Sequence, residues 1–295
     1  MAIQLSPLVN MGVIVRDAEE AYRMLHSIFD ARKIQGPYAD FLSGEQARIL
    51  HVGIGDVVLR FIEPTSEESP WSSHMKQKGP GIHHLTYTVD NIDKAIETVT
   101  GQGGIDTLFT YDIDWETLIG SDYTNPGAKT IHVMDTMGSI GFHLALAESP
   151  GENTLVSPRT RYPTGEDTLV GDASTMLHIE LVTGDSKKTF SFLHDVFGTE
   201  KVEIDFAKLL DSDFMGIVHV NLSNVVLQYC QPKAEQGTWY ELLKKNGAYI
   251  HNLNFCVDDI AETVKKFQKE SVPEIFESRL SPEGPPFYMM DTMDT

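Results

Sequence analysis

Histidine and glutamate side chains lie inside apolar, strand-like segments of this sequence. His84 stands in GIHHLTYTVDNI and His178 in MLHIELVTGD, and Glu180 is the second residue after His178. Side chains two positions apart on a strand point to the same face, so His178 and Glu180 are expected to share one face. Imidazole and carboxylate groups bind divalent metal ions and transfer protons near neutral pH. These residues are therefore candidates for metal-assisted or acid–base chemistry.

A repeat singles out these histidines, because an isolated histidine on an apolar strand is more often a packed residue than a ligand. Residues 8–29 and 176–197 align at a constant offset, and in both copies an apolar strand runs into an acidic residue at a helix start. The same offset aligns VVLRFIEP at 57–64 with VVLQYCQP at 225–232. The chain therefore contains two copies of one arrangement.

Each half is itself a doublet. The strand-and-helix start at Asn10 recurs at His84, and the start at His178 recurs at Asn252, with the same spacing in both halves. In each case, apolar alternation changes to helical spacing. This pattern predicts four modules of a strand, a helix and several further strands, at about residues 6–66, 80–148, 174–232 and 248–295.

The repeat also predicts the domain boundaries. We expect a first domain at 1–149, a second at 174–295, and a linker at 150–173 that is rich in Pro, Gly, Ser and Thr. The second module continues after its MDTM into SIGFHLALAE, whereas the sequence stops at Thr295, shortly after the second MDTM. The second domain thus lacks a last strand, and we expect the native chain to continue or its end to be unresolved.

Composition narrows the possible functions. The 295 residues are 41% apolar, and the formal net charge of -20, from 43 acidic and 23 basic residues, repels nucleic acid and anionic lipid. No apolar run approaches the roughly 18 residues that span a bilayer, and MAIQLSPLVN is unlike a signal peptide. Cys230 and Cys256 lie in apolar, strand-like runs and are expected to be free, buried thiols. We expect a cytoplasmic monomer or homodimer that acts on a small molecule, without a nucleic-acid or membrane partner.

The segment GIHHLTYTVDNIDKAI, preceded by LRFIEPTSEESPW and EQARILHVGIGD, resembles methylmalonyl-CoA epimerases of the vicinal-oxygen-chelate (glyoxalase, bleomycin resistance and dioxygenase) superfamily. LQYCQP and GTWYELLKKNGAYIHNLNFCVDDI repeat the resemblance in the second half. It covers nearly the whole chain outside the linker. The resemblance implies an α+β fold of four βαβββ modules, forming two cup-shaped, mixed and mainly antiparallel sheets with helices outside.

The resemblance also implies metal ligands, because each module of that superfamily gives a His from its first strand and a Glu or Gln from its last. The first-strand positions correspond here to Asn10, His84, His178 and Asn252. The last-strand positions correspond to Arg60, His143, Gln228 and a residue beyond Thr295. The outer modules are therefore degenerate, and Arg60 would instead bind a substrate carboxylate or pair with a buried acid.

Two pairings of the modules remain open. Pairing within each half leaves neither cup with a complete ligand set. Pairing the second module with the third gathers four residues that can all ligate: His84, His143, His178 and Gln228. We favour this crossed pairing, which would bring His84 and His178 face to face around a divalent Zn, Fe, Ni, Co or Mn ion. His83 and His251 are expected to point to the opposite strand face and to be structural.

Three functions follow from the resemblance. The first is a metal-dependent isomerase, epimerase or lyase that acts through a metal-stabilised enolate on a small oxo-acid or acyl thioester. Its base would be Glu180 or Glu45, which in GEQAR is the nearest match to the epimerase base. The second is an extradiol-type, ring-cleaving dioxygenase with Fe(II), against which the missing carboxylate at His143 counts. The third is a non-catalytic small-molecule-binding protein, against which the four intact ligand positions count.

Overall fold

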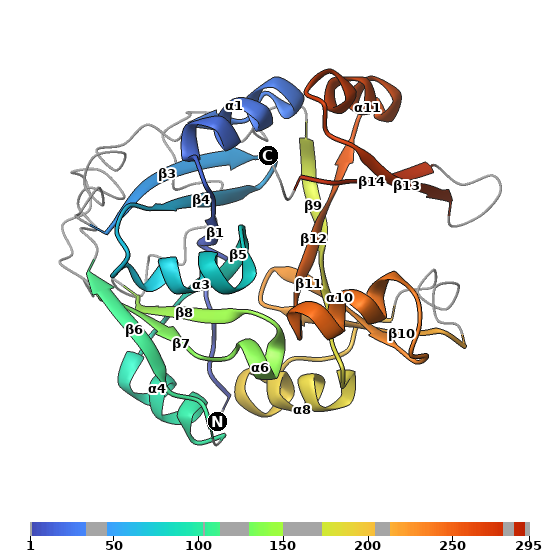
Figure 1. Cartoon of the computed structure of the whole chain (residues 1–295). Coiled ribbons are helices and arrows are strands. Elements are labelled where there is room, and N and C mark those ends of the chain that lie inside the picture. Colours follow the sequence, from blue (N-terminus) through green and yellow to red (C-terminus); the bar gives the residue numbers. More distant parts are fainter. Residues whose placement is uncertain are drawn as a thin grey trace. The chain divides into compact units, whose positions relative to one another are not determined.

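The computed structural model describes residues 2–33, 46–102, 104–112, 130–149, 173–203, 213–279 and 286–292. Glu45 and all but the last residue of the predicted linker lie outside these ranges. Helices and strands are mixed along the whole chain, and the strands form open sheets rather than closed barrels (Figure 1). The predicted α+β class is confirmed.

The chain divides into two compact units. The first unit comprises residues 1–12, 82–165 and 177–254, and the second comprises residues 13–81, 166–176 and 255–295. All but the first few residues of the second and third modules thus lie in the first unit, as crossed pairing requires. The domains 1–149 and 174–295 follow the duplication of the sequence instead, and they stay a prediction.

In the first unit, the second module follows the predicted order of a strand, a helix and further strands. Its elements are β5 (Gly81–Val89), α4 (Ile92–Thr100), β6 (Thr107–Asp112), β7 (Thr130–Met134), α6 (Met137–Ile140) and β8 (His143–Glu148). The strand order is β5-β8-β7-β6. Strand β8 is parallel to β5 and antiparallel to β7, so the last strand lies beside the first.

The third module repeats this plan, mostly within the same unit, although β9 begins and β12 ends in the second unit. Its elements, with the start of the fourth module, are β9 (Ala173–Val182), α8 (Ser186–Phe197), β10 (Met215–Leu222), β11 (Val225–Pro232), α10 (Thr238–Asn246) and β12 (Tyr249–Val257). The strand order is β10-β11-β9-β12. Among the described residues, two hydrogen bonds join the second module to the third: Thr189 Oγ1 donates to the Ser139 carbonyl over 3.1 Å, and the Tyr229 hydroxyl donates to the Ile140 carbonyl over 3.2 Å.

The second unit contains most of the first module and the end of the fourth. Its elements are β1 (Asn10–Ile14), which begins in the first unit, α1 (Ala18–Phe29), β2 (Arg32–Lys33), β3 (Ala47–Ile54), β4 (Val57–Pro64), α3 (Pro70–Lys78), α11 (Ile260–Lys269), β13 (Glu274–Arg279) and β14 (Pro286–Met290). The strand order is β2-β3-β4-β1, and β13 pairs with β14. Helices α1 and α11 pack together, with the rings of Phe29 and Phe267 5.5 Å apart.

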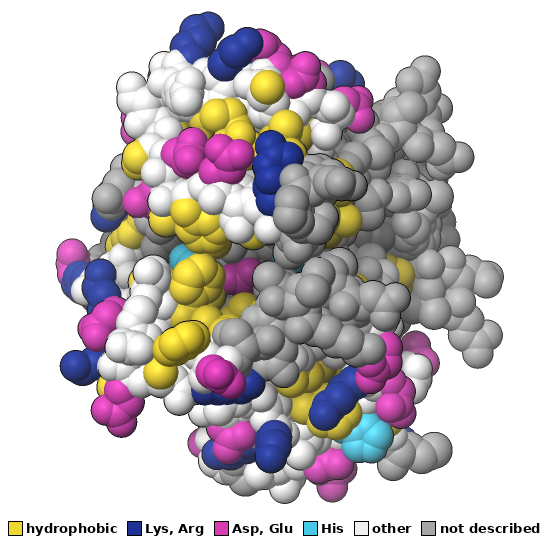
Figure 2. Space-filling view, turned by 90° about the vertical axis from the view of Figure 1, so that its right-hand side faces the viewer, with side chains coloured by type: hydrophobic (Ala, Val, Ile, Leu, Met, Phe, Trp, Pro, Cys, Tyr) yellow, Lys and Arg dark blue, Asp and Glu magenta, His cyan; other side chains and the backbone are white. Residues whose placement is uncertain are grey.

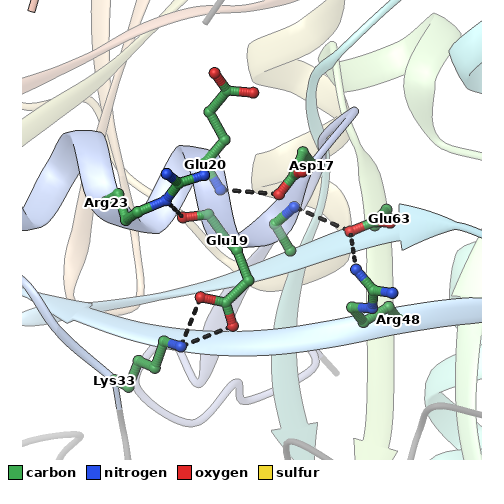
Figure 3. A network of polar contacts seen from close by, with 8 residues as sticks. Asp17, Glu19, Glu20, Arg23, Lys33, Arg48 and Glu63 are labelled. Atoms are coloured by element: carbon green, nitrogen blue, oxygen red, sulfur yellow. Dashed lines mark hydrogen bonds and ion pairs between the residues drawn. The ribbon is translucent and has the colours of Figure 1, made fainter.

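The same N-cap starts the main helix of every module. Each capping side chain accepts a hydrogen bond from the backbone N–H of the third residue after it, and the caps are Asp17, Asn91, Asp185 and Asp259. Such a cap contributes about 1 kcal/mol. At α1, the Glu63 carboxylate also accepts from the Ala18 N–H and from Arg48 (Figure 3). The repeated acidic residue before each helix is thus a cap, except that Asn91 rather than Asp90 caps α4.

Acidic side chains are spread over the face in Figure 2, and basic side chains lie among them rather than in a patch of their own. This distribution agrees with the formal net charge of -20. Among the described residues, no helix is both long and apolar enough to span a bilayer. Both cysteines are free, but only Cys230 is buried as predicted, whereas Cys256 is exposed.

Candidate active site

Three polar residues form a row across the sheet of the third module. Glu180 on β9 is the Cα partner of Gln228 on β11, and Gln228 is in turn the partner of His219 on β10. All three side chains are buried. Residues in register on adjacent strands point to the same face of a sheet, so the three polar groups can meet there.

Hydrogen bonds connect this row. His219 Nε2 donates to Gln228 Oε1 over 2.8 Å, and Gln228 Nε2 donates to Glu180 Oε2 over 2.8 Å. The other carboxylate oxygen, Glu180 Oε1, accepts from the indole Nε1 of Trp239 on α10 over 3.2 Å. Gln228 therefore bridges His219 and Glu180, and each oxygen of Glu180 has a donor.

Burial changes the protonation of two groups on β9. It raises the pKa of Glu180 to about 7, although the hydrogen bonds from Trp239, Cys230 and Gln228 act in the opposite direction. Burial, with a smaller contribution from His219, lowers the pKa of His178 to about 4. At neutral pH, Glu180 is therefore present both as acid and as carboxylate, while His178 is neutral. This is the protonation pattern of a group that both accepts and donates protons.

A cluster of histidines lies in the second module. His84 and His143 are Cα partners on β5 and β8. The ring of His83 lies 4.6 Å from that of His143, and its Nδ1 is 3.0 Å from Nδ1 of His84. His143 Nδ1 also lies 3.4 Å from Asp135 Oδ1. His83, which sequence analysis interpreted as structural, thus contacts both predicted ligands of this module.

The imidazole of His84 lies against β1. A Cβ atom at Gly12 would be 2.1 Å from His84 Cε1, so glycine is required for this close approach. Asn10, which lies on β1 at the first-strand ligand position of the first module, accepts a hydrogen bond from Thr86 Oγ1 over 3.0 Å. The amide of Asn10 is therefore used in a buried contact between β1 and β5.

In the second unit, Arg60 also makes a buried contact. Its Nε donates to His51 Nε2 over 3.0 Å, and Arg60 is 1% exposed. Burial, together with the adjacent Arg60 charge, holds the pKa of His51 well below its usual value. His51 is therefore neutral, as an acceptor from a guanidinium must be.

The predicted ligands fall into two pairs within the first unit. His84 and His143 lie together in the second module, and His178 and Gln228 lie in the third, where Gln228 is the partner of Glu180. That the two pairs face one cavity stays a prediction. Glu45 lies outside the described residues.

Comparisons with known proteins agree with this architecture. Residues 10–108 match the family model described as the glyoxalase/bleomycin resistance protein/dioxygenase superfamily. The predicted resemblance is thereby confirmed. No curated protein is similar enough to this sequence to count as a match.

Solved structures are similar in fold over most of the chain. A 4-hydroxymandelate synthase mutant from Streptomyces coelicolor matches with a TM-score of 0.60 and 16% identity, over 92% of this chain and 77% of that one. A xylose isomerase-like TIM barrel/4-hydroxyphenylpyruvate dioxygenase fusion protein matches with a TM-score of 0.55 and 14% identity, over 94% of this chain and 41% of that one. At these identities, the matches establish the fold and leave the reaction open.

Members of the superfamily generally use a divalent metal ion, so we tested whether this chain's residues fit one. Both polar atoms of the Gln228 amide are engaged, the oxygen by His219 and the nitrogen in donating to Glu180. Within the described ranges, no group of three or more His, Cys, Asp and Glu side chains is arranged to hold a metal ion. The described side chains therefore do not form a ready-made metal site, and the ligand set stays a prediction.

Sequence analysis missed His219 and Trp239, although the repeat contains a signal for both. The offset that relates the two halves places His219 at the position equivalent to His51, and Trp239 at the position equivalent to Trp71. The ligand positions of the superfamily lie on the first and last strands of each module, so mapping them onto the repeat includes neither residue. His219 lies on β10, a middle strand, and Trp239 lies on the helix α10.

Proposed function

We propose that the chain is an enzyme in which Glu180 moves a proton to and from a carbon atom beside a carbonyl group. The reaction class would be isomerisation, epimerisation or lyase cleavage of a small oxo-acid or acyl thioester. The observation that carries this proposal is the setting of Glu180: a buried carboxyl group with a donor on each oxygen and His178 two positions away on the same strand face.

This setting supports acid–base catalysis by the following steps. In its carboxylate form, Glu180 accepts the carbon-bound proton, and in its acid form it returns a proton to the same or a neighbouring carbon. Trp239 and Gln228 fix the carboxylate, so that little reorientation accompanies the transfer. A pKa of about 7 means that both forms are populated near neutral pH. His178 is neutral, so it can contact a substrate oxygen, and it would not repel a cation bound beside that oxygen.

Proton transfer can be tested without knowing the substrate. The protein is incubated in D₂O with a panel of small oxo-acids and acyl thioesters, and exchange at the α-carbon is followed by ¹H NMR. We expect wild-type protein to catalyse exchange on at least one member, and Glu180→Gln to slow it by about 10² to 10⁴-fold. Glu241→Gln on α10 is the matched control, because Glu241 is exposed. Equal rates in wild type and Glu180→Gln would contradict the proposal.

The metal-dependent form of this proposal rests on the predicted set His84, His143, His178 and Gln228. Metal analysis of the purified protein and of the variants His84→Ala and His178→Ala tests that set. If wild-type protein held no metal, the enolate would need another source of stabilisation. If it also catalysed no exchange, the binding-protein interpretation would take the place of the enzyme.

One observation favours a second candidate, an Fe(II) dioxygenase. His178 and Glu180 supply one imidazole and one carboxylate on the same strand face, which is part of the two-histidine, one-carboxylate set of non-haem iron oxygenases. The fold is also shared with proteins described as 4-hydroxymandelate synthase and 4-hydroxyphenylpyruvate dioxygenase. Oxygen uptake after loading with Fe(II), with aromatic and 2-oxo acids as substrates, distinguishes this candidate from the first.

A further inference from the structure

We propose that His219 is a positioning residue, which acts through Gln228 to hold the Glu180 carboxylate in a fixed orientation. The proposal rests on the proposed catalytic role of Glu180. It assigns Gln228 to a hydrogen-bonded bridge. It also gives a function to a histidine that the mapping of the superfamily's ligands leaves out.

The geometry of the bridge carries this inference. The two ends of the Gln228 amide differ, because its oxygen accepts and its nitrogen donates. A carboxylate can only accept, so the amide must turn its nitrogen to Glu180 and its oxygen to the other side. His219 meets that oxygen with a donor at 2.8 Å, and the amide nitrogen lies 2.8 Å from Glu180. In this orientation the amide oxygen needs a donor, and His219 supplies one, so His219 stabilises the orientation of the amide that holds Glu180.

Burial makes the hydrogen bond from His219 to Gln228 costly to lose. His219 is 3% exposed and Gln228 is 4% exposed. If His219 were replaced by an apolar residue, the Gln228 oxygen would lose its donor inside the protein, which is costly. The amide would then rotate towards other partners, and one oxygen of Glu180 would lose its donor.

The protonation of His219 agrees with this role. Burial lowers the pKa of His219, while the bond to Gln228 opposes the shift. A neutral imidazole has one N–H, and the nitrogen that faces a carbonyl oxygen must carry it. His219 is thus held as the Nε2–H tautomer, whose ring lies 6.2 Å from that of His178 in an edge-to-face arrangement.

Trp239 provides a direct report on the carboxylate, because its indole N–H donates to Glu180 Oε1. We would record the indole N–H resonance of Trp239 by ¹H–¹⁵N NMR, assigned with Trp239→Phe, in wild type, His219→Leu and His219→Gln. Glutamine at 219 places an amide N–H near the position of Nε2, whereas leucine has no donor. Trp71, which stands at the equivalent position of the first module, is the internal control.

We expect His219→Leu to shift the Trp239 resonance and leave the Trp71 resonance in place, and His219→Gln to restore the wild-type position. The α-proton exchange rate should fall about tenfold in His219→Leu, which corresponds to one hydrogen bond of ordinary net strength, and should recover in His219→Gln. If His219→Leu fails to fold, His219→Asn takes its place, because its shorter amide cannot reach Gln228.

The outcomes separate the two proposals. An unchanged Trp239 resonance in a folded variant that lacks the donor would overturn the positioning role, whatever the exchange rate. Equal shifts in His219→Leu and His219→Gln would also overturn it, because the loss would then reflect packing. A Trp239 resonance that responds as expected, in a protein that catalyses no exchange, would leave the positioning role in place and refute the proposed function.

Discussion

Two histidines at equivalent places in the repeat make opposite hydrogen bonds. In the second unit, His51 Nε2 accepts from the Arg60 guanidinium, whereas in the first unit His219 Nε2 donates to the Gln228 carbonyl. Each pair occupies facing positions on adjacent antiparallel strands. The backbone arrangement is therefore the same, and the residue at position 60 or 228 decides the direction of the bond.

The difference between Arg60 and Gln228 affects which side chain the neighbouring strand can hold. Gln228 has a second polar atom, which donates to Glu180, and a buried carboxyl group is thereby kept in place. The residue equivalent to Glu180 in the first copy of the repeat is Gly12, where the His84 imidazole fills the space of a side chain. The duplicated plan thus supports an acid in one copy and excludes it in the other.

The largest expected effect concerns the pH dependence of stability. Because the pKa of Glu180 is raised from 4.5 to about 7 in the folded protein, the folded state binds this proton more tightly than the unfolded state does. The stabilisation is complete below the unfolded pKa and is lost as the pH rises through about 7. Between about pH 4 and pH 8, wild type should lose about 3 kcal/mol of stability relative to Glu180→Gln.

Urea unfolding of both proteins at these two pH values measures the change. His178 acts in the opposite direction, since its lowered pKa gives stability that is lost as the pH falls through about 4. Its contribution is common to both proteins and cancels in the difference between them. If the unfolding free energies of wild type and Glu180→Gln changed by the same amount between these two pH values, the pKa of Glu180 would not be raised in the folded protein.

Much of the fold could be predicted from the sequence, because the repeat fixes both the register and the helix starts. The two repeat spacings, one between the halves and one within each half, located a capped helix in every module. The exception at Asn91 has a local reason, since only the residue immediately before the helix can cap it. Which modules share a compact unit depends on tertiary packing, and the ligand pattern could only favour one of two pairings.

The site was less predictable, for a physical reason. Alternation along a strand places Cβ atoms on one face or the other, but it does not place the ends of long side chains. His83 starts on the face opposite to His84, yet its ring reaches the ring nitrogen of His84. Gln228 is a predicted ligand because of its place on the last strand of its module. That place does not determine which neighbours its amide contacts, so its hydrogen bonds to His219 and Glu180 could not be predicted.

A smaller effect is expected at Gly12, and it tests why the first copy carries no acid. Gly12→Ala would place Cβ within 2.5 Å of three ring atoms of the fully buried His84. The ring must move inside a packed region, so the variant should lose about 2 kcal/mol of stability in urea unfolding. Gly138→Ala in the same unit is the control, because nothing lies within 4 Å of its added Cβ. Equal stabilities of the two variants would show that His84 moves aside freely.

The smallest expected effect is the difference between removing His51 and removing His219. His51→Leu takes an acceptor from a buried guanidinium, and hydrogen bonds to charged groups contribute about 2 kcal/mol. His219→Leu takes a donor from a neutral amide, which should cost about 1 kcal/mol. Urea unfolding at neutral pH should therefore find His51→Leu less stable than His219→Leu by about 1 kcal/mol. If His219→Leu were instead the less stable variant, the hydrogen bonds that join His219, Gln228 and Glu180 would contribute more stability than the bond between His51 and Arg60. The loss of His219 would then also have weakened the bond between Gln228 and the Glu180 carboxyl group.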